Sequence, residues 1–373
     1  MIIGIPKETW HDEKRVALTP AGAYALTKRG HQVVVQADAG LACSFTNEAY
    51  VEAGATLAFD REVVYGRADV VVKVMPLLKD EVKSMAPGKT VLSFLHFNGA
   101  NSEMLQKLID LRCTAIGYNL MDDEDGELPV LMTMSEIAGM LLPQIAGRYL
   151  ETPEGGRGAL LGRIAGIPAS TVVIIGAGMV GRTAARAFSD AGTEVLAMDN
   201  DLSRLRQLEL HTRRSVNTAI ASHYNIERYV KFADVLVGAV MIRGQQSPHV
   251  VREAQVKQMR PGGVVIDVSI DQGGCIETIR PTTHSDPVYE KHGLLHYAVP
   301  NIPALVARTA SHALNNVLVS FVQQIADQET AAFRENEILR RGIYIYEGKC
   351  TQSEVARLFG WPSFQIDELI RQR

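Results

Sequence analysis

Short apolar runs alternate along the chain with amphipathic stretches, and this alternation predicts the secondary structure. In the first third, runs rich in β-branched residues lie at 2–5, 32–36, 70–74, 90–95 and 114–118. Further runs lie at 172–175, 194–198, 235–240, 263–268 and 294–299. Strands separated by helices are typical of βαβ units, whose strands join a mostly parallel sheet. We therefore expect an α/β fold with two Rossmann-like, doubly wound parallel-sheet domains.

A glycine turn in the second set of strands carries the clearest chemical signal. The run Gly176-Ala-Gly178-Met-Val-Gly181 follows a predicted strand and opens a predicted helix at 181–191. Gly176 would allow the tight turn, Gly178 would let the backbone approach a pyrophosphate, and Gly181 would let helix and strand pack closely. The free N–H groups and the dipole at the start of the helix would hold the phosphates.

An acidic residue, Asp199, stands at the end of the next predicted strand. A carboxylate there accepts the ribose hydroxyls of an adenosine and repels a 2′-phosphate, which favours NAD over NADP. Arg204, five residues further, either contacts the adenine or ribose or lies on a solvated helix surface. Glycine turns also occur for packing reasons alone. Here strand, helix, second strand and acid follow in order, so we interpret the run as a dinucleotide site.

A helical stretch and a glycine-rich segment predict the junction between the domains. The helix over 135–149, with Thr133 and Glu136 in capping-box spacing, would link the domains. Pro143 would kink or interrupt this helix, because proline removes a backbone donor. The following segment, 154–168, holds five glycines and predicts a mobile loop.

The C-terminal part of the chain looks helical and should pack back on the first domain. We expect residues 1–133 to form the first part of a substrate domain, residues 134–300 an inserted NAD-binding domain, and residues 301–373 helices that return to the substrate domain.

Composition narrows the class of protein. The net charge is −4 with both signs interspersed, so nucleic acid is not an expected partner. Residues 1–6 are too short for a signal-peptide core, and no apolar run reaches membrane-spanning length, so we expect a soluble cytoplasmic protein without a membrane partner. The four cysteines form no C-x-x-C pair, which argues against disulfide scaffolds and structural zinc. Free thiols and no metal site are expected.

Polar residues follow several predicted strands, where ligands bind in open α/β sheets. In the first domain these are Lys7, Glu8, Arg15, Lys73, Met75, His96, Tyr118 and Asn119, and in the second they are Met241, Asp267, Ser269, Asp271 and Asn301. Each one alone has an ordinary alternative, such as a surface arginine or a histidine that satisfies a local hydrogen bond. Together they predict an interdomain cleft in which a cation, an imidazole and a carboxylate face a nicotinamide.

Several motifs resemble one known family. They are Gly4-Ile-Pro-Lys-Glu-Thr, Arg15-Val-Ala-Leu-Thr-Pro, Phe94-Leu-His96, Met134-Ser-Glu-Ile-Ala-Gly, Gly155-Gly-Arg-Gly, Asp267-Val-Ser-Ile-Asp271-Gln-Gly-Gly, Arg280-Pro-Thr-Thr and Asn301-Ile-Pro. The chain resembles alanine dehydrogenase, and less closely the alpha subunit of proton-pumping nicotinamide nucleotide transhydrogenase. His96, the Asp271 run and the lack of membrane segments favour the first, and the resemblance spans residues 4–360.

The resemblance implies a homo-oligomer, commonly a hexamer or else a dimer, which oxidatively deaminates an L-amino acid to a 2-oxo acid and ammonia with NAD. Arg15 would bind the substrate carboxylate through two hydrogen bonds. His96 would exchange protons with the amine and with the attacking water, because its ordinary pKa is near neutral. Asp271 would orient that water or bind the amine. The implied substrate contacts are Arg15, Lys73, Met75 and Tyr118, and the implied catalytic residues are His96 and Asp271. The implied cofactor contacts are Ser135, Gly176, Gly178, Met179, Val180, Gly181, Asp199, Arg204, Val240, Met241, Ile270, Asp271 and Asn301.

The chain departs from the family pattern near the substrate. Alanine dehydrogenases usually carry a second lysine two residues after the position of Lys73, and this chain has Met75 there. Where the family usually has Tyr-Glu, the chain has Tyr118-Asn119. A lost charge-assisted hydrogen bond weakens substrate binding roughly tenfold to a hundredfold. Lys73 and Met75 should lie on the same face of the strand, since side chains alternate along a strand, so Lys73 is a candidate partial substitute.

Three hypotheses follow for the function. The first is an NAD-dependent L-amino acid dehydrogenase, with L-alanine as the expected substrate. The second is an imine or opine-type reductase, or a dehydrogenase for a bulkier amino acid, and Met75 would permit either. The methionine at this position is also explained by a neutral substitution beside an intact Arg15. The third is a catalytically silent NAD-binding regulatory protein. The presence of Arg15, His96 and Asp271 together argues against it, because such a protein does not need these residues.

Overall fold

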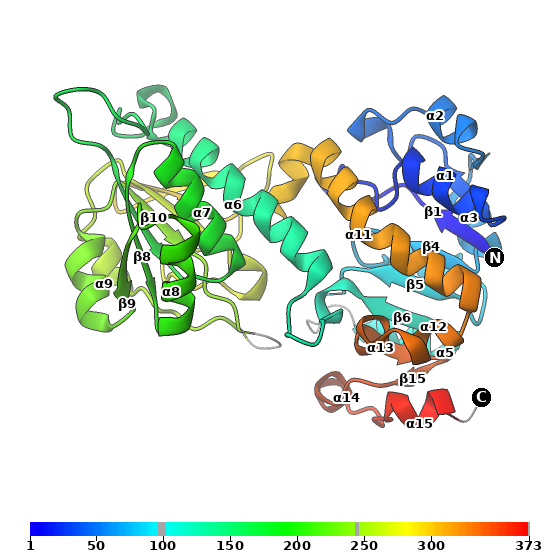
Figure 1. Ribbon diagram of the computed structural model, residues 1–373. Helices are drawn as coiled ribbons and strands as arrows, with labels where there is room; N and C mark the ends of the chain where they lie inside the picture. The colour runs from blue at the N-terminus through cyan, green and yellow to red at the C-terminus, as the bar shows by residue number, and fades with distance from the viewer. Residues whose placement is uncertain (96–101, 243–245, 372–373) are drawn as a thin grey trace. The chain divides into compact units, whose positions relative to one another are not determined.

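The computed structural model describes residues 1–95, 102–242 and 246–371 of the chain (Figure 1). The chain divides into two compact units. Unit 1 consists of Met1–Met134 and Val306–Arg373, and unit 2 consists of Ser135–Leu305. The chain therefore leaves unit 1 once and returns to it once.

Unit 1 is built on an eight-stranded sheet. Its strands are β1 (Ile2–Ile5), β2 (Gln32–Gln36), β3 (Thr56–Ala58), β4 (Val70–Val72), β5 (Thr90–Ser93), β6 (Thr114–Gly117), β14 (Ile343–Tyr346) and β15 (Lys349–Cys350). They lie in the order β15-β14-β6-β5-β4-β1-β2-β3, and the first six strands of the chain run parallel. The order reverses direction between β1 and β4, so the ends of these two strands form a topological switch point.

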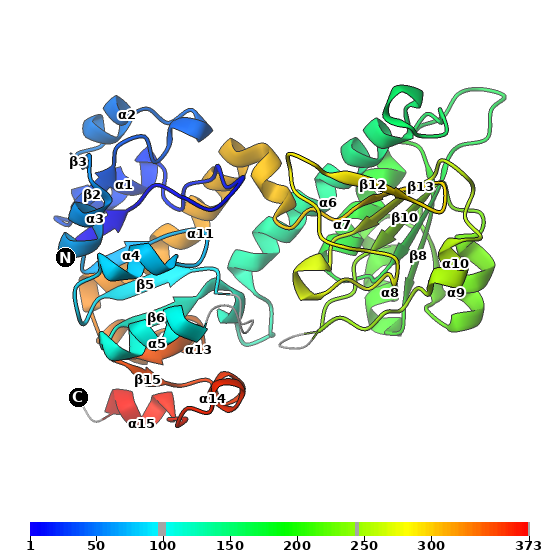
Figure 2. The ribbon, with the colours of Figure 1, turned by 180° about the vertical axis from the view of Figure 1, so that it is seen from behind.

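Helices cover both faces of this sheet. They are α1 (Pro20–Lys28), α2 (Asn47–Glu52), α3 (Arg61–Arg67), α4 (Lys79–Lys83), α5 (Ser102–Asp110), α11 (Ala307–Gln328), α12 (Ala331–Glu335), α13 (Glu337–Arg341), α14 (Ser353–Phe359) and α15 (Ile366–Arg371). The long helix α11 packs beside α1 on one face, and α3, α4 and α5 lie on the other, as the two opposite views show (Figures 1 and 2). Because both faces are covered, strands such as β4 are apolar throughout.

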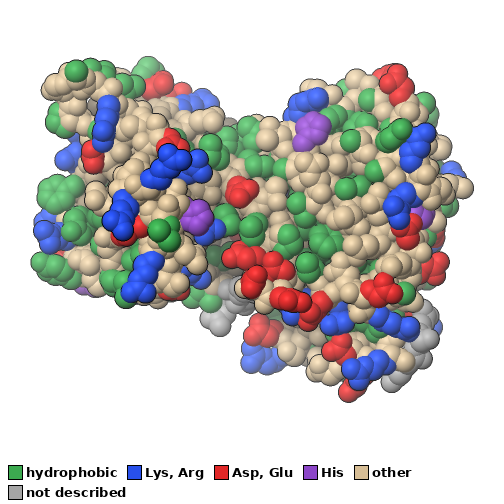
Figure 3. Space-filling model, viewed as in Figure 1, with side chains coloured by type: hydrophobic (Ala, Val, Ile, Leu, Met, Phe, Trp, Pro, Cys, Tyr) green, Lys and Arg blue, Asp and Glu red, His purple; other side chains and the backbone are tan. Residues whose placement is uncertain are grey.

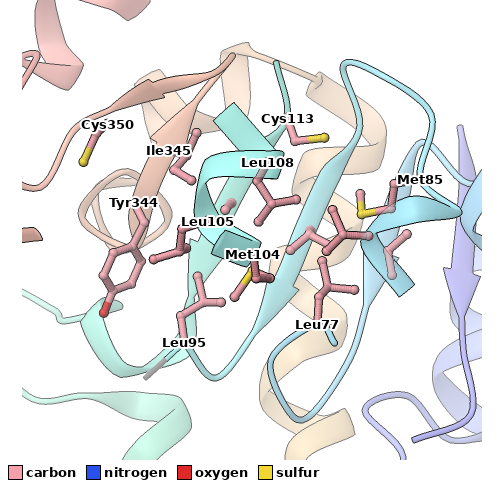
Figure 4. Packing of buried hydrophobic residues seen from close by; sticks show 14 of the residues in the cluster. Leu77, Met85, Leu95, Met104, Leu105, Leu108, Cys113, Tyr344, Ile345 and Cys350 are labelled. Atoms are coloured by element: carbon pink, nitrogen blue, oxygen red, sulfur yellow. The ribbon is translucent and has the colours of Figure 1, made fainter. Parts of the chain in front are cut away.

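The core of unit 1 joins residues from both ends of the chain. Leu105 and Leu108 of α5 pack in one buried cluster with Tyr344 and Ile345 of β14 (Figure 4). The prediction that residues 301–373 are helical is therefore wrong at β14 and β15, which run antiparallel at the edge of the sheet. The run Ile343-Tyr-Ile-Tyr346 has strand composition, but its four residues form a strand because β6 lies beside them.

Unit 2 repeats the same strand order in a seven-stranded sheet. Its strands are β7 (Thr171–Ile175), β8 (Glu194–Asp199), β9 (Asn217–Ile220), β10 (Val235–Gly238), β11 (Val264–Asp267), β12 (Val288–Lys291) and β13 (Leu294–Tyr297), in the order β12-β13-β11-β10-β7-β8-β9. All except β12 are parallel, and the switch point lies between β7 and β10. The predicted α/β fold with two doubly wound sheets is confirmed, although the short strands β3, β9 and β12 were not predicted.

Side chains on the two faces of this second sheet pack under different helices. The helices are α7 (Met179–Asp190), α8 (Leu202–His211), α9 (His223–Val230) and α10 (Glu253–Val256). Val173 and Ile175 of β7 join a cluster with Ile226 of α9 and Val256 of α10. The intervening Val172 and Ile174 are equally buried, since α7 and α8 cover the opposite face (Figures 1 and 2).

The long helix α6 (Pro129–Leu150) begins earlier than predicted. The Thr133 hydroxyl donates to the Pro129 carbonyl oxygen (2.9 Å) inside the helix, so the predicted capping box is wrong, and the helix is not interrupted at Pro143. By length and composition alone α6 is able to cross a membrane, contrary to expectation, and 44% of its apolar window is buried inside the protein. At Gly139 the helix approaches α7 so closely that a Cβ would lie 2.7 Å from the Thr183 Cβ.

Candidate active site

Arg15 stands in the loop that follows β1, at the switch point of unit 1. Only 3% of its surface is exposed, and its Nε and Nη2 donate to the two carboxylate oxygens of Glu13 at 2.8 and 2.7 Å. The remaining edge of the guanidinium faces sulfur: Nη1 lies 3.3 Å from the Met134 Sδ, and Nη2 lies 4.0 Å from the Met75 Sδ. A thioether is a weak acceptor, so a carboxylate would be a stronger partner for this edge.

Lys73, at the end of β4, is turned into the interior of unit 1. Its side chain is fully buried, and its ammonium lies 2.9 Å from the Glu81 Oε1 and 3.2 Å from the Glu8 Oε2. Burial disfavours the charged lysine, but the two carboxylates outweigh burial, so the pKa of Lys73 lies above its ordinary value. Burial raises the pKa of the Glu8 carboxyl. Because Lys73 has these internal partners, we do not retain it as a substrate contact.

Tyr118 is also fully buried, directly after β6. Its hydroxyl lies 2.9 Å from the carbonyl oxygen of Lys73 and 3.2 Å from that of Leu92, so it ties β4 to β5. The structure thus gives Tyr118 a structural role in place of the predicted substrate contact. The neighbouring Asn119 accepts a hydrogen bond from the Leu95 backbone N–H (3.1 Å). His96, the predicted proton carrier, lies outside the described residues.

The three glycines of the turn after β7 meet different surroundings. Gly176 has φ of +106°, and a Cβ there would lie 2.3 Å from the Ala239 carbonyl oxygen. A Cβ at Gly181 would lie 1.9 Å from the Gly176 carbonyl oxygen. At Gly178, the N-cap of the 12-residue helix α7, no described atom other than those of the glycine and its two chain neighbours lies within 4 Å of the Cβ position. Two glycines therefore permit close packing, and the middle one leaves open space before the helix N-terminus.

Asp199 ends β8 and contacts this turn directly. Its Oδ2 accepts the Ala177 backbone N–H at 2.7 Å, and its Oδ1 accepts the Asp201 N–H at 2.9 Å. The Nη1 of Arg204 lies 3.8 Å from the Asp199 Oδ2, and the Arg204 side chain is 52% exposed. Asp199 thus positions the glycine turn. Arg204 is an exposed helix residue that forms an ion pair with the Asp199 carboxylate. Met179 and Val180 are half-buried in the first turn of α7.

The remaining predicted cofactor contacts surround the ends of β10 and β11, which are neighbours in the sheet. Val240 is half-buried and Met241 is 50% exposed in the loop after β10. Ile270 is buried and Asp271 exposed in a short 3₁₀ turn after β11. The structure therefore brings these four residues to one edge of unit 2. Ser135 is half-buried on α6, and Asn301 is half-buried with its carbonyl oxygen 3.2 Å from the His284 Nε2.

Sequence reasoning missed Glu13, the partner of Arg15, and Glu81, the partner of Lys73. Glu13 stands only two residues before Arg15, and this spacing is the one local signal that could have indicated the pair. Glu81 lies on α4, eight residues after Lys73, and no local pattern indicates that contact.

A separate hollow in unit 1 is unsuited to a carboxylate substrate. It measures about 830 Å³ and is lined by Asp122, Asp123, Glu124, Asp125, Gln324, Gln328, Glu335, Asn336, Glu337, Ile338 and Arg341. Figure 3 shows acidic side chains gathered on the viewed face of the molecule, and they would repel an anion. Among the residues that the structure describes, no group of three or more His, Cys, Asp or Glu is arranged to hold a metal ion. All four cysteines are free and buried, as expected.

Comparison with known proteins matches two adjacent family models. Residues 4–138 match the N-terminal domain of alanine dehydrogenase/PNT, and residues 143–353 match its C-terminal domain. The chain belongs to the alanine dehydrogenase/PNT family. The predicted resemblance is therefore confirmed over nearly the whole chain.

Individual members of the alanine dehydrogenase/PNT family match over their full length. The chain is 42% identical over 374 residues to an alanine dehydrogenase of Methanococcus maripaludis, with all of both chains covered. It is 43% identical over 363 residues to an alanine dehydrogenase of Bacillus subtilis, covering 97% of this chain and 95% of the relative.

Solved structures agree with this assignment. A structure of L-alanine dehydrogenase superimposes with a TM-score of 0.92 at 37% identity, covering 96% of this chain and 99% of the other. A transhydrogenase from Sinorhizobium meliloti shares the fold, with a TM-score of 0.82 at 22% identity, covering 95% of this chain and 100% of the other.

Proposed function

We propose that this chain catalyses the reversible oxidative deamination of L-alanine to pyruvate and ammonia with NAD. The observation that carries the proposal is the full-length identity of about 40% to proteins named alanine dehydrogenase. It is supported by Arg15, whose outer edge faces only weak acceptors in the described residues and so suits a substrate carboxylate.

Unit 2 has the features that a dinucleotide requires. The space at Gly178 and the N-terminus of α7 suit a pyrophosphate, and the Asp199 carboxylate suits the ribose hydroxyls of NAD. Ser135, Val240, Met241, Ile270 and Asn301 would line the nicotinamide site. These residues would hold NAD, which would supply the acceptor for the hydride that leaves the Cα of the amino acid.

Three residues of this chain would bind the substrate and transfer its protons. Arg15 would exchange its thioether contacts for two hydrogen bonds to the substrate carboxylate and so fix the direction of the Cα–H bond. His96 would take a proton from the ammonium group and exchange protons with the water that attacks the imine. Asp271 would bind the amine or orient this water, and its carboxylate would stabilise the positive charge of the iminium.

A second candidate function rests on Met75. Its sulfur lies beside Arg15, where a cation would strengthen carboxylate binding, and a flexible apolar side chain suits a bulkier amino acid or an imine. A dehydrogenase for such a substrate, or an imine or opine-type reductase, would use the same cofactor. A silent NAD-binding regulatory protein would need neither Arg15 nor Asp271.

We further propose that the protein acts in the cytoplasm as a homo-oligomer, most simply a hexamer. Its partners would be small amino acids and 2-oxo acids, with no nucleic acid or membrane involved, consistent with the net charge of −4.

The decisive experiment measures NADH formation from a panel of L-amino acids, and NADH consumption with 2-oxo acids plus ammonium or alkylamines. We expect L-alanine and pyruvate with ammonium to be the preferred pair. Turnover of another substrate without alanine or pyruvate turnover would replace the proposal with the second candidate. His96→Ala should lose nearly all turnover while NADH still binds, and retained activity would exclude its proton-transfer role.

A further inference from the structure

A single buried hydroxyl connects the two loops that follow β10 and β11. Ser247 is 5% exposed, and its Oγ donates to the Val240 carbonyl oxygen at 2.8 Å. Its backbone N–H donates to the Gln272 carbonyl oxygen at 2.9 Å. One residue therefore bonds to the backbone beside the proposed nicotinamide site and to the residue directly after Asp271.

The loop that carries Asp271 is held at its base by the side chain of Asp267. The carboxylate of Asp267, which is fully buried at the end of β11, accepts three backbone N–H groups. They come from Ser269 (2.9 Å), Cys275 (2.7 Å) and Ile276 (2.9 Å), on both sides of the loop. Such bonds to a carboxylate are among the strong hydrogen bonds of a protein, so the base of the loop is rigid.

The segment after Ser247 runs beside the second half of this loop. The Val250 N–H donates to the Cys275 carbonyl oxygen at 2.8 Å, and the Glu277 N–H donates to the Val251 carbonyl oxygen at 2.9 Å. Ser247 is thus the end of a short paired segment anchored on the Asp271 loop. Its hydroxyl joins this segment to the Val240 carbonyl oxygen.

We propose that Ser247 is a positioning residue that holds Val240 at a fixed distance from Asp271. The inference rests on the proposed function, because Val240 would line the nicotinamide site and Asp271 would act on the amine. Hydride transfer requires the reacting atoms about 3–3.5 Å apart and aligned, and displacements near 1 Å slow reactions about a hundredfold. Ser247 would therefore affect the hydride step without touching substrate or cofactor through its side chain.

The test compares Ser247→Ala with a matched control, Ser170→Ala. The Ser170 hydroxyl also donates to a backbone carbonyl oxygen, that of Leu160 at 2.7 Å, and Ser170 is 6% exposed. Ser170 precedes β7, at the opposite end of the strands from the proposed site. Both variants lose one buried hydroxyl of equal kind, so a purely structural effect should be the same in each.

The measurements are the rate of NADH formation in the first turnover with saturating L-alanine, the NADH dissociation constant, and the thermal midpoint. We expect Ser247→Ala to slow the first turnover about tenfold, with the NADH dissociation constant changed less than threefold. Ser170→Ala should keep the wild-type rate, and Ser247→Thr, which retains a hydroxyl, should recover most of it.

Three results would overturn the inference: a rate within twofold of wild type in Ser247→Ala, an equal loss in Ser170→Ala, or a loss that merely follows weaker NADH binding. If the wild-type protein forms no NADH from L-alanine, the proposed function fails first, and this inference fails with it. Failure of Ser247→Ala in an active enzyme leaves the proposed function intact.

Discussion

Arg15 donates two of its five N–H groups to Glu13, and the remaining edge of its guanidinium faces sulfur. Glu13 neutralises the guanidinium through two short hydrogen bonds, so the pair carries no net charge. A substrate carboxylate would meet directed donors there but little excess positive charge. The Met75 sulfur lies beside Arg15, where a cation would add the positive charge that favours carboxylate binding.

We predict that Met75→Lys strengthens substrate binding. The added ammonium would lie beside Arg15 and supply a charge-assisted hydrogen bond, typically worth about 1.5–3 kcal/mol, so the apparent KM for pyruvate should fall roughly tenfold or more. Steady-state NADH consumption checks this, and Met75→Leu, which adds no charge, is the control. An unchanged or higher KM in Met75→Lys would mean that residue 75 does not face the substrate carboxylate.

His296 on β13 is a second residue whose environment has a measurable consequence. It is fully buried, with Nε2 2.9 Å from the Thr278 Oγ1 and Nδ1 3.2 Å from the Leu294 carbonyl oxygen. Burial lowers the pKa of His296 to about 4, from its ordinary value of 6.5. Between these values the unfolded chain binds a proton that the folded chain does not.

Unfolding free energy should therefore fall as the pH drops from about 6.5 to about 4, by up to about 3 kcal/mol from this residue. Above pH 6.5 the contribution is fully present. In His296→Gln this dependence should vanish, so the difference in unfolding free energy between wild type and variant should shrink from pH 7 to pH 4. Denaturant unfolding at several pH values measures it, with His11→Gln as an exposed control. A constant difference would show that burial does not lower the pKa of His296 in the folded protein.

At the scale of elements, two glycines in the turn from β7 to α7 are present for different reasons. Gly181 is required because the helix crosses the strand end too closely for a Cβ, whereas Gly178 has ordinary φ of −68° and open space around it. Packing explains Gly181 and leaves Gly178 unexplained. The approach of the pyrophosphate of the proposed NAD would account for Gly178.

This distinction predicts opposite outcomes for two alanine substitutions. Gly178→Ala should keep the unfolding free energy within about 1 kcal/mol, because its φ suits alanine, but weaken NADH binding at least about tenfold. Gly181→Ala should lose about 1–3 kcal/mol of stability as well, since its Cβ meets a backbone oxygen. Fluorescence titration with NADH and denaturant unfolding provide both readings. Normal NADH affinity in Gly178→Ala would show that the pyrophosphate of NADH does not bind at this turn.

At the scale of the whole molecule, the chain builds the same parallel strand order twice. In each sheet the order reverses beside the first strand, so the loops after β1 and β4, and after β7 and β10, are where ligands bind in such folds. Arg15 and Met75 follow the first pair, and the glycine turn and Val240 follow the second. The two units thus have equivalent topology but carry different chemistry.

The cofactor should change the stability of the whole chain in a selective manner. NADH at a hundred times its dissociation constant should stabilise the folded state by about 2.7 kcal/mol. NADPH should give a much smaller shift, because the Asp199 carboxylate repels a 2′-phosphate. Thermal unfolding with each nucleotide measures this, and Gly178→Ala serves as the variant with weakened binding. Equal shifts with both nucleotides would contradict the proposed preference for NAD.

The sequence by itself determined the alternation of strands and helices, the glycine turn and the acidic end of β8. These features depend on neighbouring residues: apolar runs, backbone conformations that only glycine adopts, and a spacing set by one βαβ unit. The family motifs added the proposed roles of Arg15, His96 and Asp271.

Only the tertiary structure decided which polar residues face inward. Lys73 is paired with Glu8, 65 positions away along the chain, and the Tyr118 hydroxyl contacts the Lys73 carbonyl oxygen, so neither is free for substrate. The strand β14 likewise forms because β6 lies beside it. Such contacts join segments that are distant in sequence, so no local pattern specifies them, and they exist only once the sheets have formed.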